Sequence, residues 1–153
     1  MSTRTSVIMA TYNGAQYIKQ QIESIINQTH KNIEIIIQDD GSTDDTVPIL
    51  ETYAATDDRI RIIRNEKNLG INQNFYELIK KASGQFIAIS DQDDIWDLNK
   101  LEILLKEINE KEWFNRLGVI LKRQQENYAI SQILEMFKDV LTDLFNRYVE
   151  EDS

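Results

Sequence analysis

The chain has 153 residues, of which 41% are hydrophobic and 28% charged, a composition typical of a globular domain rather than of a disordered or fibrous chain. It contains no cysteine and a single histidine, His30. This excludes disulfides, zinc fingers, iron–sulfur clusters, thiol nucleophiles and any metal site that needs several histidines from one chain. The formal net charge of -9 argues against wrapping DNA or coating an anionic membrane, so we expect no nucleic-acid partner.

Short apolar runs alternate with helical patterns through the first 110 residues. The strand-like runs are short and mostly β-branched, and the helical patterns place apolar residues three and four positions apart. The expected strands lie at 7–10, 33–37, 60–63 and 86–89, and the expected helices at 17–26, 47–53, 75–82 and 98–108. Ser42 and Asp45 fit a capping box before the second helix. The alternation predicts an α/β fold, an αβα sandwich around a mainly parallel sheet.

The pattern changes after about residue 111. Apolar residues recur at helical spacing from Ile130 to Tyr148, which predicts a long amphipathic helix. A wide apolar face must be covered, either by the rest of the chain or by a second copy in a homodimer. We therefore expect two parts: a domain over 1–111 and an α-helical extension over 112–153 that serves packing or oligomerisation.

No stretch of the sequence looks like a membrane span or an export signal. No run of about 18 apolar residues occurs, so no transmembrane segment is expected. The polar amino terminus leads directly into Val7-Ile8-Met9, a run far too short for the apolar region of a signal peptide. The expectation is a cytoplasmic protein.

Polar clusters follow three of the expected strands. They are Thr11-Tyr12-Asn13, Asp39-Asp40 and Asp91-Gln92-Asp93-Asp94. Parallel sheets bind ligands outside the carboxyl ends of their strands, so these clusters should share one edge of the sheet. Carboxylates in such a turn suit Mg²⁺ or Mn²⁺, which is usually shared with substrate phosphates. The plainer alternative is a solvated acidic turn that caps the next helix.

The other two clusters also have a functional and a plain interpretation. A strand-end tyrosine such as Tyr12 can stack on a nucleobase, although an isolated tyrosine is more often ordinary packing. One carboxylate of Asp39-Asp40 could accept a hydrogen bond from a base N–H or a ribose hydroxyl, while Gly41 and Ser42 shape the turn. Neither G-x-G-x-x-G nor the P-loop pattern is present, so the dinucleotide and P-loop interpretations lose their main support.

An ordered set of motifs over roughly residues 5–108 resembles the family 2 glycosyltransferases of GT-A fold. The motifs are Ser6-Val-Ile-Met-Ala-Thr-Tyr-Asn-Gly14, Gln28-Thr, Gln38-Asp-Asp-Gly-Ser-Thr-Asp44, Asn68-Leu-Gly70 and Ser90-Asp-Gln-Asp-Asp-Ile-Trp96. The resemblance implies a GT-A-like domain that binds a nucleotide-diphosphate sugar, here a UDP- or dTDP-sugar. In that family's pattern, Tyr12 would stack on the base, with Thr11 and Asn13 lining the pocket. Asp40 would hydrogen-bond the base, with Asp39 as the alternative partner.

The same resemblance assigns the acidic cluster to a metal. Asp91 would face the ribose or a metal-bound water, and Asp93 would coordinate Mn²⁺ or Mg²⁺, the D-x-D arrangement of these enzymes. The metal would neutralise the pyrophosphate as leaving group. The variants Ala-Thr-Tyr-Asn-Gly and Asp-Gln-Asp-Asp-Ile-Trp look like those of rhamnosyltransferases and related enzymes of bacterial surface polysaccharide synthesis.

Two functions follow from the resemblance. The first is an inverting, metal-assisted glycosyltransferase that transfers a sugar to a glycan or lipid-linked acceptor in cell-envelope glycan synthesis, with peripheral association at the inner face of the membrane. The second is a truncated, non-catalytic nucleotide-sugar-binding or assembly module. The second remains open because residues 112–153 do not resemble the family's acceptor half, and no residue can be assigned as general base.

Overall fold

The computed structural model describes residues 3–110 of the chain. The expected helical extension over 112–153, its apolar face from Ile130 to Tyr148 and the homodimer suggested for that face lie outside the described residues.

Four strands alternate with four helices within this range, as the sequence predicts. The strands are β1 (Thr5–Thr11), β2 (Ile33–Asp39), β3 (Ile60–Arg64) and β4 (Phe86–Ser90). The helices are α1 (Ile18–Ile26), α2 (Thr46–Ala54), α3 (Ile71–Lys81) and α4 (Lys100–Glu110). The expected α/β fold is therefore confirmed for this part of the chain.

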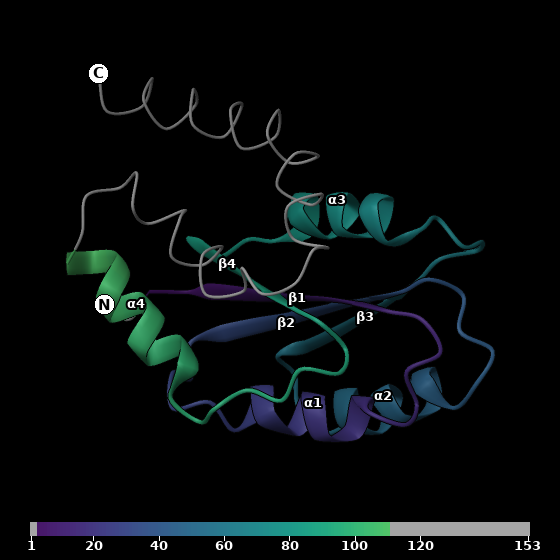
Figure 1. Cartoon of the computed structure of the whole chain (residues 1–153), viewed down its shortest axis with the longest axis horizontal. Helices are drawn as coiled ribbons and strands as arrows, with labels where there is room; N and C mark the ends of the chain where they lie inside the picture. The colour runs from purple at the N-terminus through teal and green to yellow at the C-terminus, as the bar shows by residue number, and fades with distance from the viewer. Residues whose placement is uncertain (1–2, 111–153) are drawn as a thin grey trace, which may run out of the picture. The chain divides into compact units, whose positions relative to one another are not determined.

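The strands form one parallel sheet in the order β3-β2-β1-β4. Helices α1 and α2 cover one face of the sheet and α3 covers the other (Figure 1). Such a sheet is buried on both faces, which explains why the central strands are nearly continuous runs of β-branched residues. Val7 and Met9 of β1 join the core cluster that contains Ile22 of α1. Ile8 points to the opposite face and is equally buried.

The start of α2 differs from the expected capping box. The helix begins at Thr46, its N-cap is Asp45, and the Asp45 side chain makes no capping hydrogen bond. The Ser42 hydroxyl instead donates to Asp39 Oδ1 at 2.5 Å. Asp44 Oδ1 accepts from the Thr46 backbone N–H at 3.0 Å. The capping-box prediction is wrong because the turn after β2 uses Ser42 for its own closure.

The start of α4 also lies later than predicted. Leu98 was expected on the apolar stripe of this helix, but it precedes the helix and is 60% exposed. The distant side chain of Gln28 sets the boundary. Its Nε2 donates to the Asp97 carbonyl at 2.6 Å, and its Oε1 accepts from the Leu101 N–H at 3.0 Å. A partner this far away in sequence leaves no local signal.

The strand register leaves a gap between β1 and β4 at the carboxyl ends of the strands. Thr11 of β1 pairs with Asp39 of β2, and Asp39 pairs with Arg64 of β3, so these three strands end in one row. On the other side, the pairing of β1 with β4 stops at Met9 and Ser90. The residues after Ser90 therefore diverge from β1 while β1 continues to Thr11, and a crevice can form between them.

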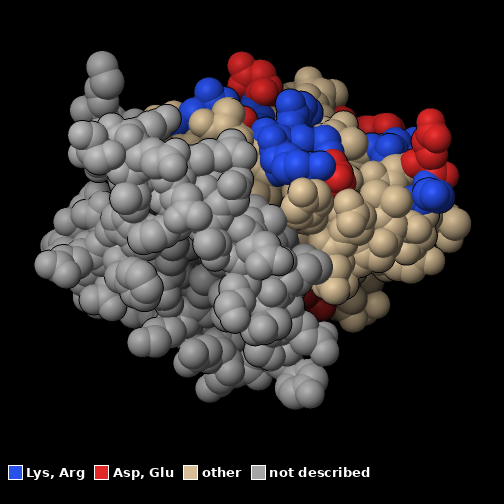
Figure 2. Space-filling view, turned by 90° about the horizontal axis from the view of Figure 1, so that it is seen from above, with Lys and Arg blue, Asp and Glu red and all other residues tan. Residues whose placement is uncertain are grey.

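The face that carries α3 presents mixed charge. Lys and Arg side chains lie beside Asp and Glu there (Figure 2). On α3 itself, Lys80 and Lys81 both pair with Glu77, with Nζ–carboxylate distances of 2.8 and 3.7 Å. Across residues 3–110, no helix is long and apolar enough to span a membrane.

Candidate functional site

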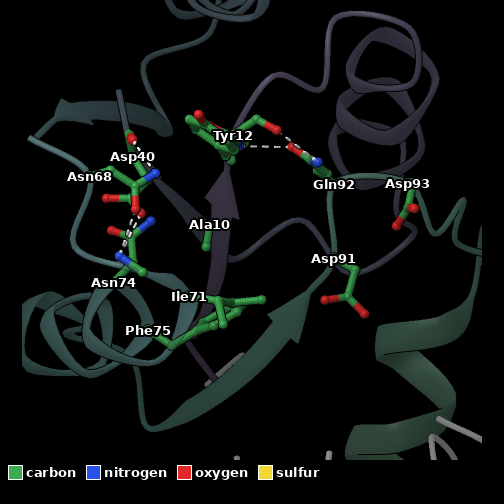
Figure 3. A pocket seen from close by; sticks show the side chains of 12 residues that line it. Ala10, Tyr12, Asp40, Asn68, Ile71, Asn74, Phe75, Asp91, Gln92 and Asp93 are labelled. Carbon is green, nitrogen blue, oxygen red and sulfur yellow. Dashed lines mark hydrogen bonds between the residues drawn. The ribbon is translucent and has the colours of Figure 1, made fainter. Parts of the chain in front are cut away.

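A pocket of about 470 Å³ lies at the carboxyl edge of the sheet. Its walls come from the ends of β1, β2 and β4 and from the loop and first turns of α3 (Figure 3). The lining residues are Ala10, Thr11, Tyr12, Asp40, Asn68, Gly70, Ile71, Asn74, Phe75, Asp91, Gln92 and Asp93. A polar group around Asp40 lies at one end and the carboxylates of the β4 turn lie at the other (Figure 3).

The pocket brings together five of the seven site residues predicted from the sequence. These are Thr11, Tyr12, Asp40, Asp91 and Asp93. Tyr12 is 50% exposed, although it is a large aromatic side chain, and it borders the pocket from the end of β1. Asn13 and Asp39 do not line the pocket.

Asp39 is a buried turn residue, 1% exposed. Its Oδ1 accepts from the Thr11 hydroxyl at 2.9 Å as well as from Ser42. Its Oδ2 accepts from the backbone N–H groups of Gly41 at 3.2 Å and Ser42 at 2.8 Å. Gly41 has φ of 85°, a conformation that a side chain disfavours. This carboxylate therefore closes the turn after β2 and ties it to the end of β1.

Asn13 fixes the neighbouring loop. It adopts a left-handed conformation with φ of 47°, which asparagine tolerates better than most residues. Its N–H donates to the Ser42 hydroxyl at 2.8 Å, and its Oδ1 accepts from the Thr43 N–H at 2.9 Å. The loop after β1 is thus fastened to the turn after β2, directly beside Tyr12.

Asp40 directs its carboxylate at the loop that precedes α3. It is 4% exposed, and its Oδ1 accepts from Asn65 Nδ2 at 2.8 Å and from the Leu69 N–H at 2.7 Å. Its Oδ2 accepts from the Gly70 N–H at 2.9 Å. An ionised carboxyl has about four acceptor positions, so three internal bonds hold it in place and leave one position for a ligand.

The turn after β4 carries an electrostatic strain that a cation would relieve. Burial raises the pKa of the Asp91 carboxyl above its usual range, and the negative charges of Asp93 and Asp94 raise it further. Among residues 3–110, no group of three or more acidic, His or Cys side chains is arranged to hold a metal alone. Two carboxylates at a pocket edge fit Mg²⁺ or Mn²⁺ when a diphosphate supplies the other ligands.

The sequence alone did not identify the α3 side of the pocket. Ile71 and Phe75 form its apolar wall, and Asn68 and Asn74 join the polar group at Asp40. Asn68 and Gly70 belonged to a recognised motif, but nothing assigned them to a pocket. Ile71 and Phe75 stand one helical turn apart at the start of α3, a spacing that also fits an ordinary core stripe.

Replacing Asp91 should stabilise the metal-free protein at neutral pH. A carboxyl whose pKa is raised in the folded state binds more protons there than in the unfolded state. The free energy of unfolding therefore falls as pH rises from the pKa of the unfolded state to the raised pKa of the folded state. Asp91→Asn removes this penalty. We expect the variant to unfold at a higher urea concentration than the parent at pH 7.5 in EDTA, with the difference shrinking toward pH 4.

Asp58→Asn is the matched control for this experiment. Asp58 is exposed and precedes β3, at the opposite edge of the sheet, so its replacement should change the free energy of unfolding by less than about 0.5 kcal/mol. Lower or unchanged stability of Asp91→Asn at pH 7.5 would contradict the strain at this turn.

Comparison with a family model gives a match over most of the chain. The model for glycosyl transferase family 2 matches residues 6–150. The match extends beyond the resemblance expected over roughly residues 5–108 and includes most of residues 112–153, where the sequence alone showed no likeness to the family.

Three curated relatives share 38–41% identity with the chain. Glycosyltransferase GlyG of Streptococcus pneumoniae is 38% identical over 73% of this chain and 37% of its own length. The putative teichuronic acid biosynthesis glycosyltransferase TuaG of Bacillus subtilis is 38% identical over 69% of this chain and 42% of its own length. The β-1,3-glucosyltransferase WfgD of Escherichia coli is 41% identical over 64% of this chain and 38% of its own length. The chain therefore spans about two fifths of these relatives.

Solved structures show the same fold. Residues 1–349 of Staphylococcus aureus TarS, in complex with UDP, match with a TM-score of 0.65 and 30% identity over 70% of this chain and 32% of that chain. The complex of the same protein with UDP-GlcNAc matches equally well, with a TM-score of 0.65. The GT-A fold expected from the motifs is thereby confirmed. The family model, the relatives and the fold agree, and the chain belongs to glycosyl transferase family 2.

Proposed function

We propose that this chain forms the donor half of a glycosyltransferase of cell-envelope polysaccharide synthesis, binding a UDP- or dTDP-sugar with Mn²⁺ or Mg²⁺. One observation carries the proposal. A single pocket at the carboxyl edge of the sheet joins a half-exposed tyrosine, a fixed carboxylate and an acidic turn. The tyrosine and the fixed carboxylate suit the base of a nucleotide-diphosphate ligand, and the acidic turn suits its ribose and, through a cation, its charged diphosphate.

The base would occupy the end between Tyr12 and Asp40. The exposed ring of Tyr12 offers a stacking surface, and the apolar side chains of Ile71 and Phe75 keep that end of the pocket partly dry. The remaining acceptor position of Asp40 suits a base N–H. Thr11 borders the same end, while Asn13 and Asp39 support it from behind through the turn.

The diphosphate would occupy the acidic end. Asp93, with Asp91, would hold the cation between protein and phosphate oxygens. A bound Mn²⁺ or Mg²⁺ supplies Lewis-acid stabilisation of the departing diphosphate. The protein's own contribution is to place two carboxylates at the end of β4, where neither accepts a hydrogen bond from another residue in the described range 3–110.

The relatives support the choice of donor and pathway. TarS has been solved with UDP and with UDP-GlcNAc, WfgD is described as using UDP-Glc, and TuaG is assigned to teichuronic acid biosynthesis. We infer a glycan or lipid-linked acceptor by the same likeness. An inverting transfer needs a general base for the acceptor hydroxyl, and we assign that role to no residue of this chain.

Calorimetric titration with UDP and dTDP, each with Mn²⁺ and with EDTA, tests the proposal. The parent protein should bind at least one nucleotide more tightly with Mn²⁺, and Asp93→Ala should lose the gain from the metal. Asp58→Ala, the same change at the opposite edge of the sheet, should bind like the parent. If the parent binds neither nucleotide, or if Asp93→Ala binds like the parent, the donor site is wrongly assigned.

A further inference from the structure

The side chain of Gln92 bridges the opening between β1 and β4. The paired part of these strands ends at Met9 and Ser90, so the backbone of the acidic turn no longer bonds to β1 in the ladder. Gln92 stands between the two carboxylates of that turn, and its side chain reaches back across the gap to the end of β1 (Figure 3).

Two hydrogen bonds make this bridge. Gln92 Oε1 accepts from the Tyr12 backbone N–H at 3.0 Å, and Gln92 Nε2 donates to the Tyr12 carbonyl at 3.2 Å. A side-chain amide thus takes the place of the peptide group that a neighbouring strand would offer. Because a glutamine amide has one acceptor and one donor end, it satisfies both backbone groups of one residue.

Gly14 provides the space for this amide. A Cβ built on Gly14 would lie 2.3 Å from Gln92 Oε1 and 2.7 Å from its Cδ. Any side chain at position 14 would therefore displace the amide. The backbone of Gly14 is itself held, because its N–H donates to Thr46 Oγ1 at 2.8 Å. The amide lies in a space formed by fixed backbone on two sides, at Tyr12 and at Gly14.

We propose that Gln92 is a positioning residue that couples the two ends of the pocket, so that a metal–diphosphate bound at Asp91 and Asp93 strengthens base binding at Tyr12. This inference rests on the proposed function. The bridge joins the two ligand-binding turns directly: the carboxylates flank Gln92 in the chain, and Tyr12 is the residue it holds. Ordering either turn orders the other, and such coupling is reciprocal.

The coupling can be measured as a ratio of dissociation constants. For each protein, the ratio is the Kd of UDP in EDTA divided by its Kd in saturating Mn²⁺. Couplings between sites are typically about 5–150-fold, and we expect Gln92→Met, which keeps the length but loses both hydrogen bonds, to reduce the ratio at least fivefold. A purely structural role would weaken binding equally with and without metal and leave the ratio unchanged.

Gly14→Ala provides an independent variant that leaves Gln92 intact. The new methyl group collides with the far end of a flexible side chain, so Gln92 should swing away with little loss of stability. We expect Gly14→Ala to reduce the ratio as Gln92→Met does. Gln20→Met, the same substitution at an exposed position of α1, is the control and should keep the parent ratio.

Amide exchange of Tyr12 tests the bridge without any nucleotide. The Tyr12 N–H should exchange at least tenfold faster in Gln92→Met than in the parent, while amides of β2 keep their rates. Parent-like ratios in both Gln92→Met and Gly14→Ala, in a parent protein that does bind UDP, would overturn the coupling alone. A parent that binds no nucleotide would overturn the proposed function and the coupling with it, even if Tyr12 exchange showed the bridge.

Discussion

Asp39→Ala is expected to lower the free energy of unfolding by roughly 3–4 kcal/mol. The carboxylate of Asp39 is buried and accepts from both the hydroxyl and the N–H of Ser42, from the Gly41 N–H and from the Thr11 hydroxyl. Truncation removes all four hydrogen bonds and leaves the buried Thr11 hydroxyl without this acceptor. For a chain of this size, the loss corresponds to a fall in Tm of roughly 10 °C.

Asp45→Ala is the matched control for this prediction. Asp45 lies in the same loop and carries the same charge, but it is exposed and makes no side-chain cap to α2. Its replacement should change the free energy of unfolding by less than about 0.5 kcal/mol. Urea denaturation followed by circular dichroism compares the two variants. Equal small effects would show that the Asp39 network does not stabilise the turn.

The sequence predicted the helices and strands well because the spacing of apolar residues depends on which faces of each element are buried. The central strands are buried on both faces and the helices on one, so β-branched runs and three-to-four spacing mark them directly. The expected parallel sheet then predicted that the polar clusters after β1, β2 and β4 share one edge. The pocket confirms that these ends meet, since residues from all three line it.

Residue roles within the motifs were much harder to predict. Asp39 and Asp40 are adjacent and chemically identical, yet one closes a turn and the other faces the pocket. Their roles differ because the two side chains point in different directions at the end of β2. The residue types alone do not indicate those directions. The bonds of Gln28 to Asp97 and of Gln92 to Tyr12 cross 69 and 80 positions of sequence. No local pattern identifies such partners.

The hydrogen bonds also distinguish residues that support the loops around the pocket from residues that line it. Asn13 and Asp39 hold turns without lining the pocket, whereas Asp40 and Gln92 both line the pocket and hold a turn. Asn13 and Asp39 fasten the loops after β1 and β2, which leaves Tyr12 half exposed and Asp40 with an open acceptor position. A substitution behind the pocket should therefore change stability first, and one within it should change ligand choice first.

The last expected result concerns that ligand choice and the carboxylate of Asp40. Three N–H donors fix this carboxylate, so its open position can only accept a hydrogen bond. Uracil and thymine present an N–H at ring position 3, whereas cytosine presents a lone pair there. A hydrogen bond to a charged group contributes about 1.5–3 kcal/mol, so UDP should bind roughly 10–100-fold more tightly than CDP.

Asp40→Asn should reverse much of this preference. An amide in the same position places an NH₂ group among the three donors, and the group that turns toward the pocket can then donate to cytosine. We expect the ratio of CDP to UDP dissociation constants, measured by calorimetry with Mn²⁺, to fall at least tenfold in Asp40→Asn. Asp45→Asn, in the exposed part of the preceding loop, should keep the parent ratio. CDP binding as tight as UDP binding in the parent would show that Asp40 does not read the base, because its charge would then face a lone pair without penalty.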